Sequence, residues 1–123
     1  MHKAPSIAIV DDNLSVRRAI ANLVESAGFE AHTFASPEEF LKARPNCDTE
    51  CLILDIRMPG MSGLELQSEL LARNDRIPII FISAHGDDSA RAQGLNAGAL
   101  AFLGKPWDAQ ELLDAVQLAL EMN

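Results

Sequence analysis

The sequence predicts an α/β fold, a doubly wound (βα)5 arrangement in which helices cover both faces of a five-stranded parallel sheet. Short apolar runs without polar alternation are typical of strands that are buried on both faces. Segments with helical spacing lie between these runs, and such alternation favours right-handed crossovers between parallel strands. The expected strands are residues 7–10, 29–34, 51–54, 77–82 and 99–103.

The first helix is expected from the spacing of its apolar residues. They fall three and four positions apart on one face, and Gly28 follows as a natural stop. The members of this face are Val16, Ile20, Leu23, Val24 and Ala27.

Capping residues mark where other helices begin. A Ser or Asp side chain accepts hydrogen bonds from free N–H groups of a first turn, and a Glu three positions later often completes the cap. The pairs are Ser36 with Glu39, Ser62 with Glu65, and Asp108 with Glu111. Asp87 or Asp88 can cap the fourth helix, 89–96, whose few large apolar residues make it the expected mobile element.

Composition favours one soluble domain, residues 1–123, in the cytoplasm. A chain of 123 residues with 48% hydrophobic residues can bury one core. No apolar stretch approaches the roughly 20 residues that span a bilayer. The formal charge of −8 opposes contact with nucleic acid. The two cysteines, Cys47 and Cys51, fit neither a redox motif nor a zinc site and are expected to be reduced thiols.

Polar residues end four of the apolar runs: Asp11 with Asp12, then Asp55, Ser83 and Lys105. The carboxyl ends of parallel strands meet at one edge of a sheet, where ligands collect, so these side chains are expected to meet. Clustered carboxylates repel one another unless a cation joins them, and Mg²⁺ prefers oxygen ligands. The pattern therefore predicts a magnesium site that can receive a phosphoryl group.

Asp55 is the expected nucleophile, because a carboxylate can attack a phosphoryl group when a metal and a fixed cation offset charge repulsion. Asp12 and Asp55 are assigned as direct Mg²⁺ ligands and Asp11 as a water-mediated one, since Mg²⁺ usually takes one or two carboxylates. Lys105 would pair with phosphate oxygens, and Ser83 would donate a hydrogen bond to one.

Each of these residues alone has a more ordinary explanation. Asp11 and Asp12 resemble helix caps, although Asn13 can serve that purpose, and Asp55 resembles a turn former. Ser83 alone is usually a loop hydroxyl, and Lys105 a solvated charge. Their occurrence at the same end of four strands is what favours a shared site.

Four segments resemble the receiver domain of two-component response regulators, most closely the nitrogen-fixation (FixJ-type) transcriptional subfamily. This resemblance covers essentially the whole chain and implies the flavodoxin-like receiver fold. The segments are the Asp11–Asp12 pair, 54–63 (LDIRMPGMSG), 82–87 (ISAHGD), and the closing part from Ala97-Gly98-Ala99 to Lys105-Pro106-Trp107.

The resemblance implies that Asp55 accepts phosphate from a histidine kinase, with Mg²⁺ held by Asp11, Asp12 and the backbone carbonyl of Arg57. It also implies that Lys105 binds phosphate and that the Lys105–Pro106 peptide can be cis. The domain is then a signalling protein rather than an enzyme, although it assists its own phosphorylation and dephosphorylation.

The resemblance further implies a switch. Ser83, which stands where threonine is commoner, would move toward phosphate and Phe102 would turn inward. The fourth helix, fifth strand and fifth helix would then present a changed surface that supports dimerisation and controls transcription through a C-terminal output domain, which is absent or removed here. By position alone, Phe102 could equally be a core residue.

Arg57 and His85 each lie two residues beyond a site residue. We expect both to border the entrance to the acyl phosphate and to tune its hydrolysis.

Alternative functions remain open at the level of sequence. An aspartyl phosphatase usually has a second acid where Arg57 stands, and a flavin binder needs a phosphate-cradling loop where Asp11 and Asp12 would repel phosphate. The segment from Gly98 to Lys105 misses the nucleotide-binding loop spacing. The main alternative is an adaptor of the same fold that works without phosphorylation through its fourth and fifth helices.

Overall fold

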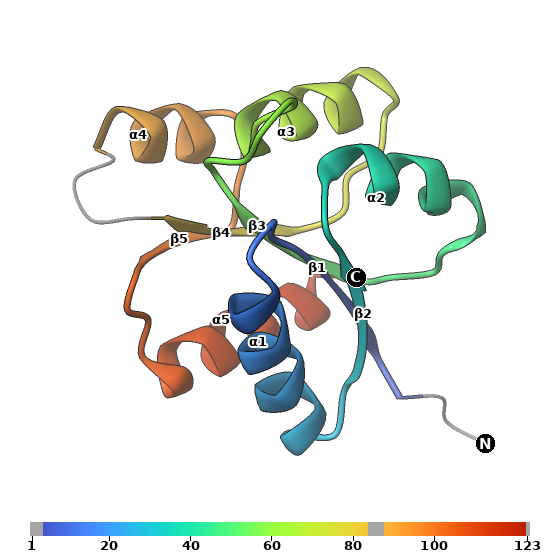
Figure 1. Cartoon of the computed structure of the whole chain (residues 1–123), viewed down its shortest axis with the longest axis vertical. Coiled ribbons are helices and arrows are strands. Elements are labelled where there is room, and N and C mark those ends of the chain that lie inside the picture. Colours follow the sequence, from blue (N-terminus) through green and yellow to red (C-terminus); the bar gives the residue numbers. More distant parts are fainter. Residues whose placement is uncertain (1–3, 84–87, 123) are drawn as a thin grey trace.

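The computed structural model describes residues 4–83 and 88–122 and contains one parallel sheet. Its strands lie in the order β2-β1-β3-β4-β5 (Figure 1). Their bounds are β1 Ser6–Val10, β2 Glu30–Phe34, β3 Cys51–Asp55, β4 Ile79–Ser83 and β5 Ala101–Gly104. All four neighbouring pairs are parallel, which confirms the predicted sheet.

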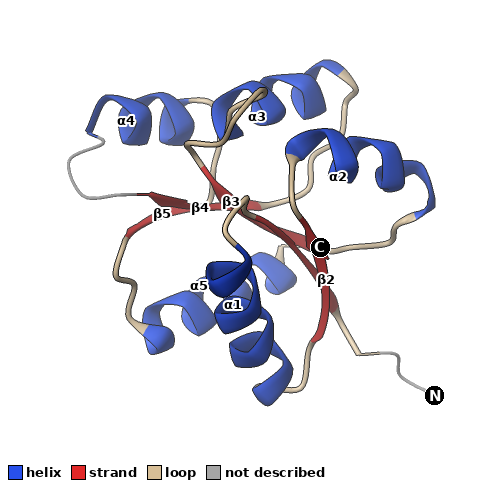
Figure 2. Ribbon diagram, viewed as in Figure 1, coloured by secondary structure: helices blue, strands red, loops and turns tan. Residues whose placement is uncertain are grey.

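Helices cover both faces of this sheet, as Figures 1 and 2 show. One layer holds α1 (Leu14–Ser26) and α5 (Ala109–Glu121). The other holds α2 (Pro37–Ala43), α3 (Gly63–Ala72) and α4 (Asp88–Asn96), and a short 3₁₀ helix, η1 (Arg44–Asn46), follows α2. No helix within the described ranges is long and apolar enough to cross a membrane.

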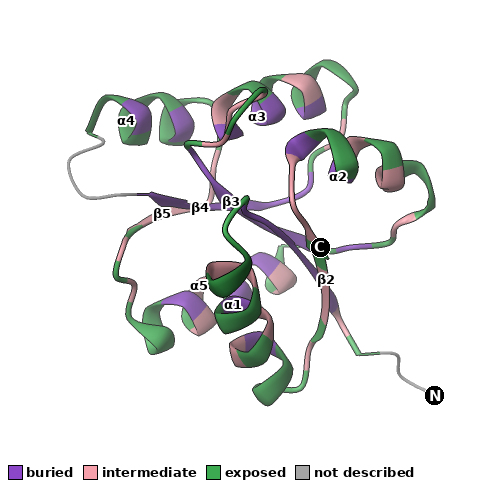
Figure 3. Ribbon diagram, viewed as in Figure 1, coloured by how far each residue is buried: buried purple, intermediate pink, exposed green. Residues whose placement is uncertain are grey.

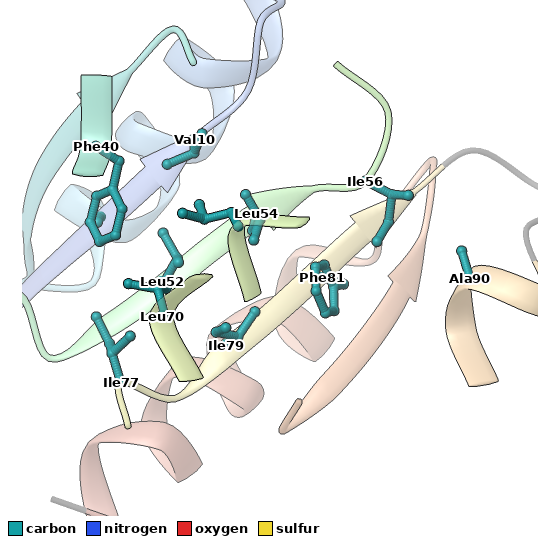
Figure 4. Packing of buried hydrophobic residues seen from close by; sticks show 12 residues of the cluster. Val10, Phe40, Leu52, Leu54, Ile56, Leu70, Ile77, Ile79, Phe81 and Ala90 are labelled. Carbon is teal, nitrogen blue, oxygen red and sulfur yellow. The ribbon is translucent and has the colours of Figure 1, made fainter. Parts of the chain in front are cut away.

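The inner strands are buried on both faces, which explains their unbroken apolar sequences (Figure 3). Every residue of β1, β3 and β4 is buried, whereas the edge strands β2 and β5 are only partly covered. Two hydrophobic clusters fill the spaces between sheet and helices. One packs under α2 and α3 and includes Phe40, Leu54 and Phe81 (Figure 4), and the other packs under α1 and α5.

The predicted capping residues begin the helices as expected. Asn13, Ser36, Ser62 and Asp108 each accept a hydrogen bond from a first-turn N–H. Ser62 forms the complete reciprocal box with Glu65. Asp88 is the first residue of α4, and Asp87 lies outside the described residues.

Two strands begin later than predicted because of how the preceding helices end. The prediction started strands at Phe29 and Ala99, but the N–H groups of these residues instead close α1 and α4, donating to Val24 O at 3.1 Å and Gly94 O at 3.0 Å. Such helix endings need a residue with positive φ. Gly28 (φ 93°) and Gly98 (φ 106°) provide it, so β2 and β5 start one and two residues later.

The fourth strand also begins later than the predicted start at residue 77. Pro78 has no N–H to give to a ladder, and β4 starts just after it at Ile79. The Pro78 carbonyl still accepts from Leu52 N at 2.9 Å, so the segment before β4 is already aligned with β3.

Candidate metal and phosphoryl site

The predicted site residues lie at the carboxyl ends of four adjacent strands. Asp11 directly follows β1, Asp55 ends β3, Ser83 ends β4 and Lys105 directly follows β5. Because these strands are neighbours in the order β1-β3-β4-β5, residues far apart in the sequence share one edge of the sheet. The Lys105 N–H donates to Ser83 O at 2.7 Å, which continues the ladder into the site.

Three carboxylates converge at this edge. Asp11, Asp12 and Asp55 each offer an oxygen, and these oxygens all lie within 4.8 Å of one another. Asp11 is fully buried and Asp55 is 5% exposed, whereas Asp12 is exposed. Among the described residues they form the only group of three or more potential metal ligands.

Lys105 supplies the positive charge that the sequence predicted. Its Nζ lies 3.5 Å from Asp55 Oδ1 and 3.6 Å from Asp11 Oδ2. The ammonium therefore lies between the two buried carboxylates, with a side chain that is 28% exposed. In the described part of the chain, Lys105 is the only cation in an ion pair with these carboxylates. Three ionised carboxylates would therefore carry excess negative charge, which suits a divalent ion.

Two oxygens of Asp11 accept hydrogen bonds that fix its position. Its Oδ1 accepts from Asn13 N at 2.8 Å, and its backbone carbonyl accepts from Arg17 Nη1 at 2.7 Å. Its Oδ2 is buried and has no hydrogen-bond partner in the structure. A buried carboxylate oxygen without a hydrogen bond is costly, so this atom fits a cation ligand, directly or through water.

The two buried carboxylates are harder to ionise than free aspartates. The pKa of Asp55 is raised to about 6, first by burial and then by the negative charge of Asp11, while Lys105 opposes the shift. Burial also raises the pKa of Asp11, opposed by the Asn13 N–H and by Lys105. A bound dication would favour the ionised form of both groups.

The start of α3 lies against the Asp55 backbone. Gly63 N donates to Ile56 O at 2.9 Å, and a Cβ at Gly63 would collide with the Asp55 carbonyl oxygen. Glycine at this position therefore lets the β3–α3 connection turn tightly beside the proposed nucleophile. Arg57 is exposed on this connection.

The proposed switch residues lie on β4 and β5. Ser83 is fully buried at the end of β4. Phe102 is partly exposed and packs against Phe81, with ring centroids 6.0 Å apart. His85 lies outside the described residues, and the Lys105–Pro106 peptide is cis, as the resemblance implies.

Sequence reasoning missed Arg17, which is not part of the apolar face predicted for the first helix. Its guanidinium instead reaches back to the Asp11 carbonyl. Its position in the sequence could have indicated this contact. Arg17 lies one helical turn after the Asn13 cap, and a side chain there lies over the preceding turn and can reach the loop before the helix.

A family model described as the response regulator receiver domain matches residues 7–117. The chain belongs to the response regulator receiver domain family. Among solved structures, FixJ-N is similar to this chain with a TM-score of 0.91 and 34% identity. The match covers 98% of this chain and 96% of FixJ-N. The response regulator StyR has a TM-score of 0.89 and 49% identity, with 98% of this chain and 61% of StyR covered.

Curated relatives of this receiver domain are longer proteins. Nodulation protein W of Bradyrhizobium diazoefficiens is 46% identical over 117 residues, which cover 95% of this chain and 52% of the relative. The transcriptional regulatory protein TdiR of Thauera aromatica is 44% identical over 120 residues, covering 98% and 53%. The chain therefore spans about half the length of these relatives.

Proposed function

We propose that this receiver domain, residues 1–123, accepts a phosphoryl group on Asp55 from a phosphohistidine of a histidine kinase. In this step the P–N bond to histidine breaks, a P–O bond to an Asp55 carboxylate oxygen forms, and the histidine leaves as neutral imidazole after taking up a proton. The observation that carries the proposal is the meeting of Asp11, Asp12, Asp55 and Lys105 at one edge of the sheet.

A metal would be held by this carboxylate group, with Asp12 and Asp55 as direct ligands, Asp11 through water, and the Arg57 backbone carbonyl as a further ligand. Mg²⁺ is the expected ion, because the ligands are hard oxygens and Mg²⁺ keeps several waters. When bound, the ion offsets the repulsion between carboxylates and an incoming phosphoryl group.

Lys105 and Ser83 would stabilise the phosphorylated form. The ammonium of Lys105 already lies 3.5 Å from an Asp55 oxygen and can pair with phosphate oxygens there. Ser83 would donate its hydroxyl to the phosphoryl group. Arg57 and His85 are proposed to tune hydrolysis of the acyl phosphate by admitting or excluding water.

Phosphorylation would change the surface formed by α4, β5 and α5, and this change would be recognised by the next partner. Movement of Ser83 toward phosphate favours an inward Phe102, which shifts the population between two packings of this face. We propose that this face supports a homodimer and controls an output domain in cis. TdiR and FixJ are transcriptional regulatory proteins by name, so transcription is the proposed output.

This role is that of a cytoplasmic signalling protein that catalyses only its own phosphorylation and dephosphorylation. The net charge of −8 disfavours direct contact with nucleic acid, so DNA binding would belong to the output domain.

The test is phosphorylation by acetyl phosphate, followed by intact mass measurement. We expect one added phosphoryl group in the presence of Mg²⁺, and none with EDTA or in Asp55→Asn. Asp48→Asn makes the same chemical change at an exposed aspartate and should leave the uptake intact. Absence of uptake in the unmodified chain, or uptake that survives Asp55→Asn, would contradict the proposal and favour the phosphorylation-independent adaptor.

A further inference from the structure

Helix α4 has few apolar contacts with the rest of the molecule. Of its nine residues only Ala90 and Gly94 are buried, and neither has a large side chain. Ala90 and Gly94 therefore contribute little hydrophobic stabilisation, because the free energy of burial scales with apolar area. The position of α4 on the sheet must depend on specific contacts.

One such contact is a buried hydrogen bond from α3. The Gln67 side chain is among the few buried polar groups, with 3% of the residue exposed, and its Nε2 donates to Gly94 O at 3.0 Å. A buried amide is costly to leave unpaired, so this bond resists separation of the two helices. Gly94 O also accepts from Ala99 N at 3.0 Å, so it keeps a partner if the Gln67 amide is removed.

The same residue of α4 lies directly on the aromatic ring beneath it. A Cβ added at Gly94 would lie 2.9 Å from Phe81 Cε2, closer than real side chains approach. Phe81 is fully buried on β4 (Figure 4) and packs against Phe102 on β5, to which it is also aligned in register. The contacts therefore run from α3 through α4 and β4 to the proposed switch aromatic.

We infer that Gln67 is a positioning residue that ties α4 to α3 and so sets how readily phosphorylation displaces the α4 surface. A hydrogen bond of 3.0 Å is lost after a displacement of about 1 Å, so a movement of α4 along the sheet must break this bond. This inference rests on the proposed function, because it assigns Gln67 to regulation of the same switch.

The first experiment measures how far the Gln67–Gly94 hydrogen bond stabilises α4, without any phosphorylation. Gln67→Met removes the amide at nearly constant shape and helix propensity, and Gln93→Met makes the same change at an exposed position of α4. We expect hydrogen exchange in residues 88–96 to rise about fivefold in Gln67→Met, with β1 and α1 unchanged, and no rise in Gln93→Met. Unchanged exchange in Gln67→Met would overturn the inference.

Gly94→Ala tests the same contact between α3 and α4 by changing the residue whose carbonyl accepts the Gln67 hydrogen bond. The added methyl group meets the Phe81 ring and should push α4 outward, so exchange in residues 88–96 should also rise. This variant keeps the inference testable if Gln67→Met fails to fold. Protection of α4 that is unchanged in Gly94→Ala would count against the role given to Gly94.

The second experiment separates a regulatory role from a structural one. Beryllium trifluoride with Mg²⁺ mimics a phosphoryl group on aspartate, and its affinity is measured by calorimetry. We expect about fivefold tighter binding to Gln67→Met than to the unmodified chain or to Gln93→Met, because displacement of α4 then costs less. Equal or weaker binding, with exchange raised, would overturn the regulatory role while leaving the proposed function intact. Absence of binding to the unmodified chain would instead count against the proposed function, and the inference would fall with it.

Discussion

At the scale of single residues, the structure places Asp55 where its charge is unfavourable. It is 5% exposed and lies beside Asp11, so its pKa is raised to about 6 from an ordinary 3.8. The folded chain therefore holds a proton on Asp55 more readily than the unfolded chain does. Its contribution to stability is greatest below the unfolded pKa of 3.8 and is lost as the pH rises through about 6.

Asp55→Asn is therefore expected to stabilise the fold at neutral pH in the absence of metal. The neutral amide removes a buried charge, which should raise the free energy of unfolding by about 1–3 kcal/mol near pH 7. Urea unfolding in EDTA measures this gain, which should shrink as the pH is lowered from about 7 toward about 4. Asp48→Asn, at an exposed aspartate, should show no such gain. A variant that is less stable than the unmodified chain near pH 7 would contradict the burial argument.

At the scale of helices and strands, the features predicted correctly are those that depend on local sequence. Ser36, Ser62 and Asp108 cap helices because their side chains reach N–H groups only two or three residues ahead. Two of the errors arise where two elements compete for one N–H. Phe29 and Ala99 are apolar and were assigned to strands, yet their N–H groups close the preceding helices.

The ion pair of Arg44 with Asp75 joins distant segments and was not predicted from the sequence. The guanidinium donates from Nε to Asp75 Oδ2 at 2.6 Å and from Nη2 to Oδ1 at 3.0 Å. It also donates to the backbone carbonyls of Cys47 and Thr49 at 2.9 and 3.1 Å. This one side chain therefore joins the segment after α2 to the segment after α3.

Arg44→Met should destabilise the fold by about 1–3 kcal/mol near neutral pH, because it removes a paired, largely covered charge and leaves acceptors without donors. Arg44 lowers the pKa of Asp75 below 3.8, so the stabilisation is present above that pH and is lost as the pH falls through the lowered pKa. Chemical unfolding near pH 7 and pH 3 measures both effects.

Arg73 provides the matched control for this prediction. It pairs with Glu69 at 3.0 Å, but both side chains are more than two-fifths exposed, at 48% and 42%. Arg73→Met should therefore change stability by no more than about 0.5 kcal/mol. Equal losses in the two variants would show that burial does not distinguish these ion pairs.

At the scale of the whole molecule, the site at the sheet edge was predictable from the sequence, whereas the contact between helices α3 and α4 was not. The alternation of strands and helices predicted a parallel sheet whose carboxyl strand ends share one edge, so Asp11, Asp55 and Lys105 were predicted together. The strand order β2-β1-β3-β4-β5 comes from the structure. The Gln67–Gly94 contact joins residues 27 positions apart on two helices and follows from tertiary packing. No periodicity or motif encodes that contact, because a glutamine in a helix is ordinarily exposed.

The proposed dimer is the remaining property at this scale. Helices α3 and α4 lie on one side of the sheet (Figure 1). Each carries an exposed leucine, Leu95 on α4 and Leu71 on α3, with 37% and 46% of the residue accessible. Only α4 belongs to the proposed α4-β5-α5 surface. A glutamate in place of Leu95 would bring an unpaired charge into that interface, whereas Leu71 lies outside it.

We expect acetyl phosphate with Mg²⁺ to convert the monomer to a dimer in sedimentation velocity, and Asp55→Asn to remain monomeric. Leu95→Glu should weaken the phosphorylated dimer by about tenfold or more, because burying a charge costs more than the lost leucine contact. Leu71→Glu carries the same change in charge and should dimerise normally. If Leu71→Glu blocks dimerisation and Leu95→Glu does not, the contact surface includes α3, and the output face must be reassigned to that helix.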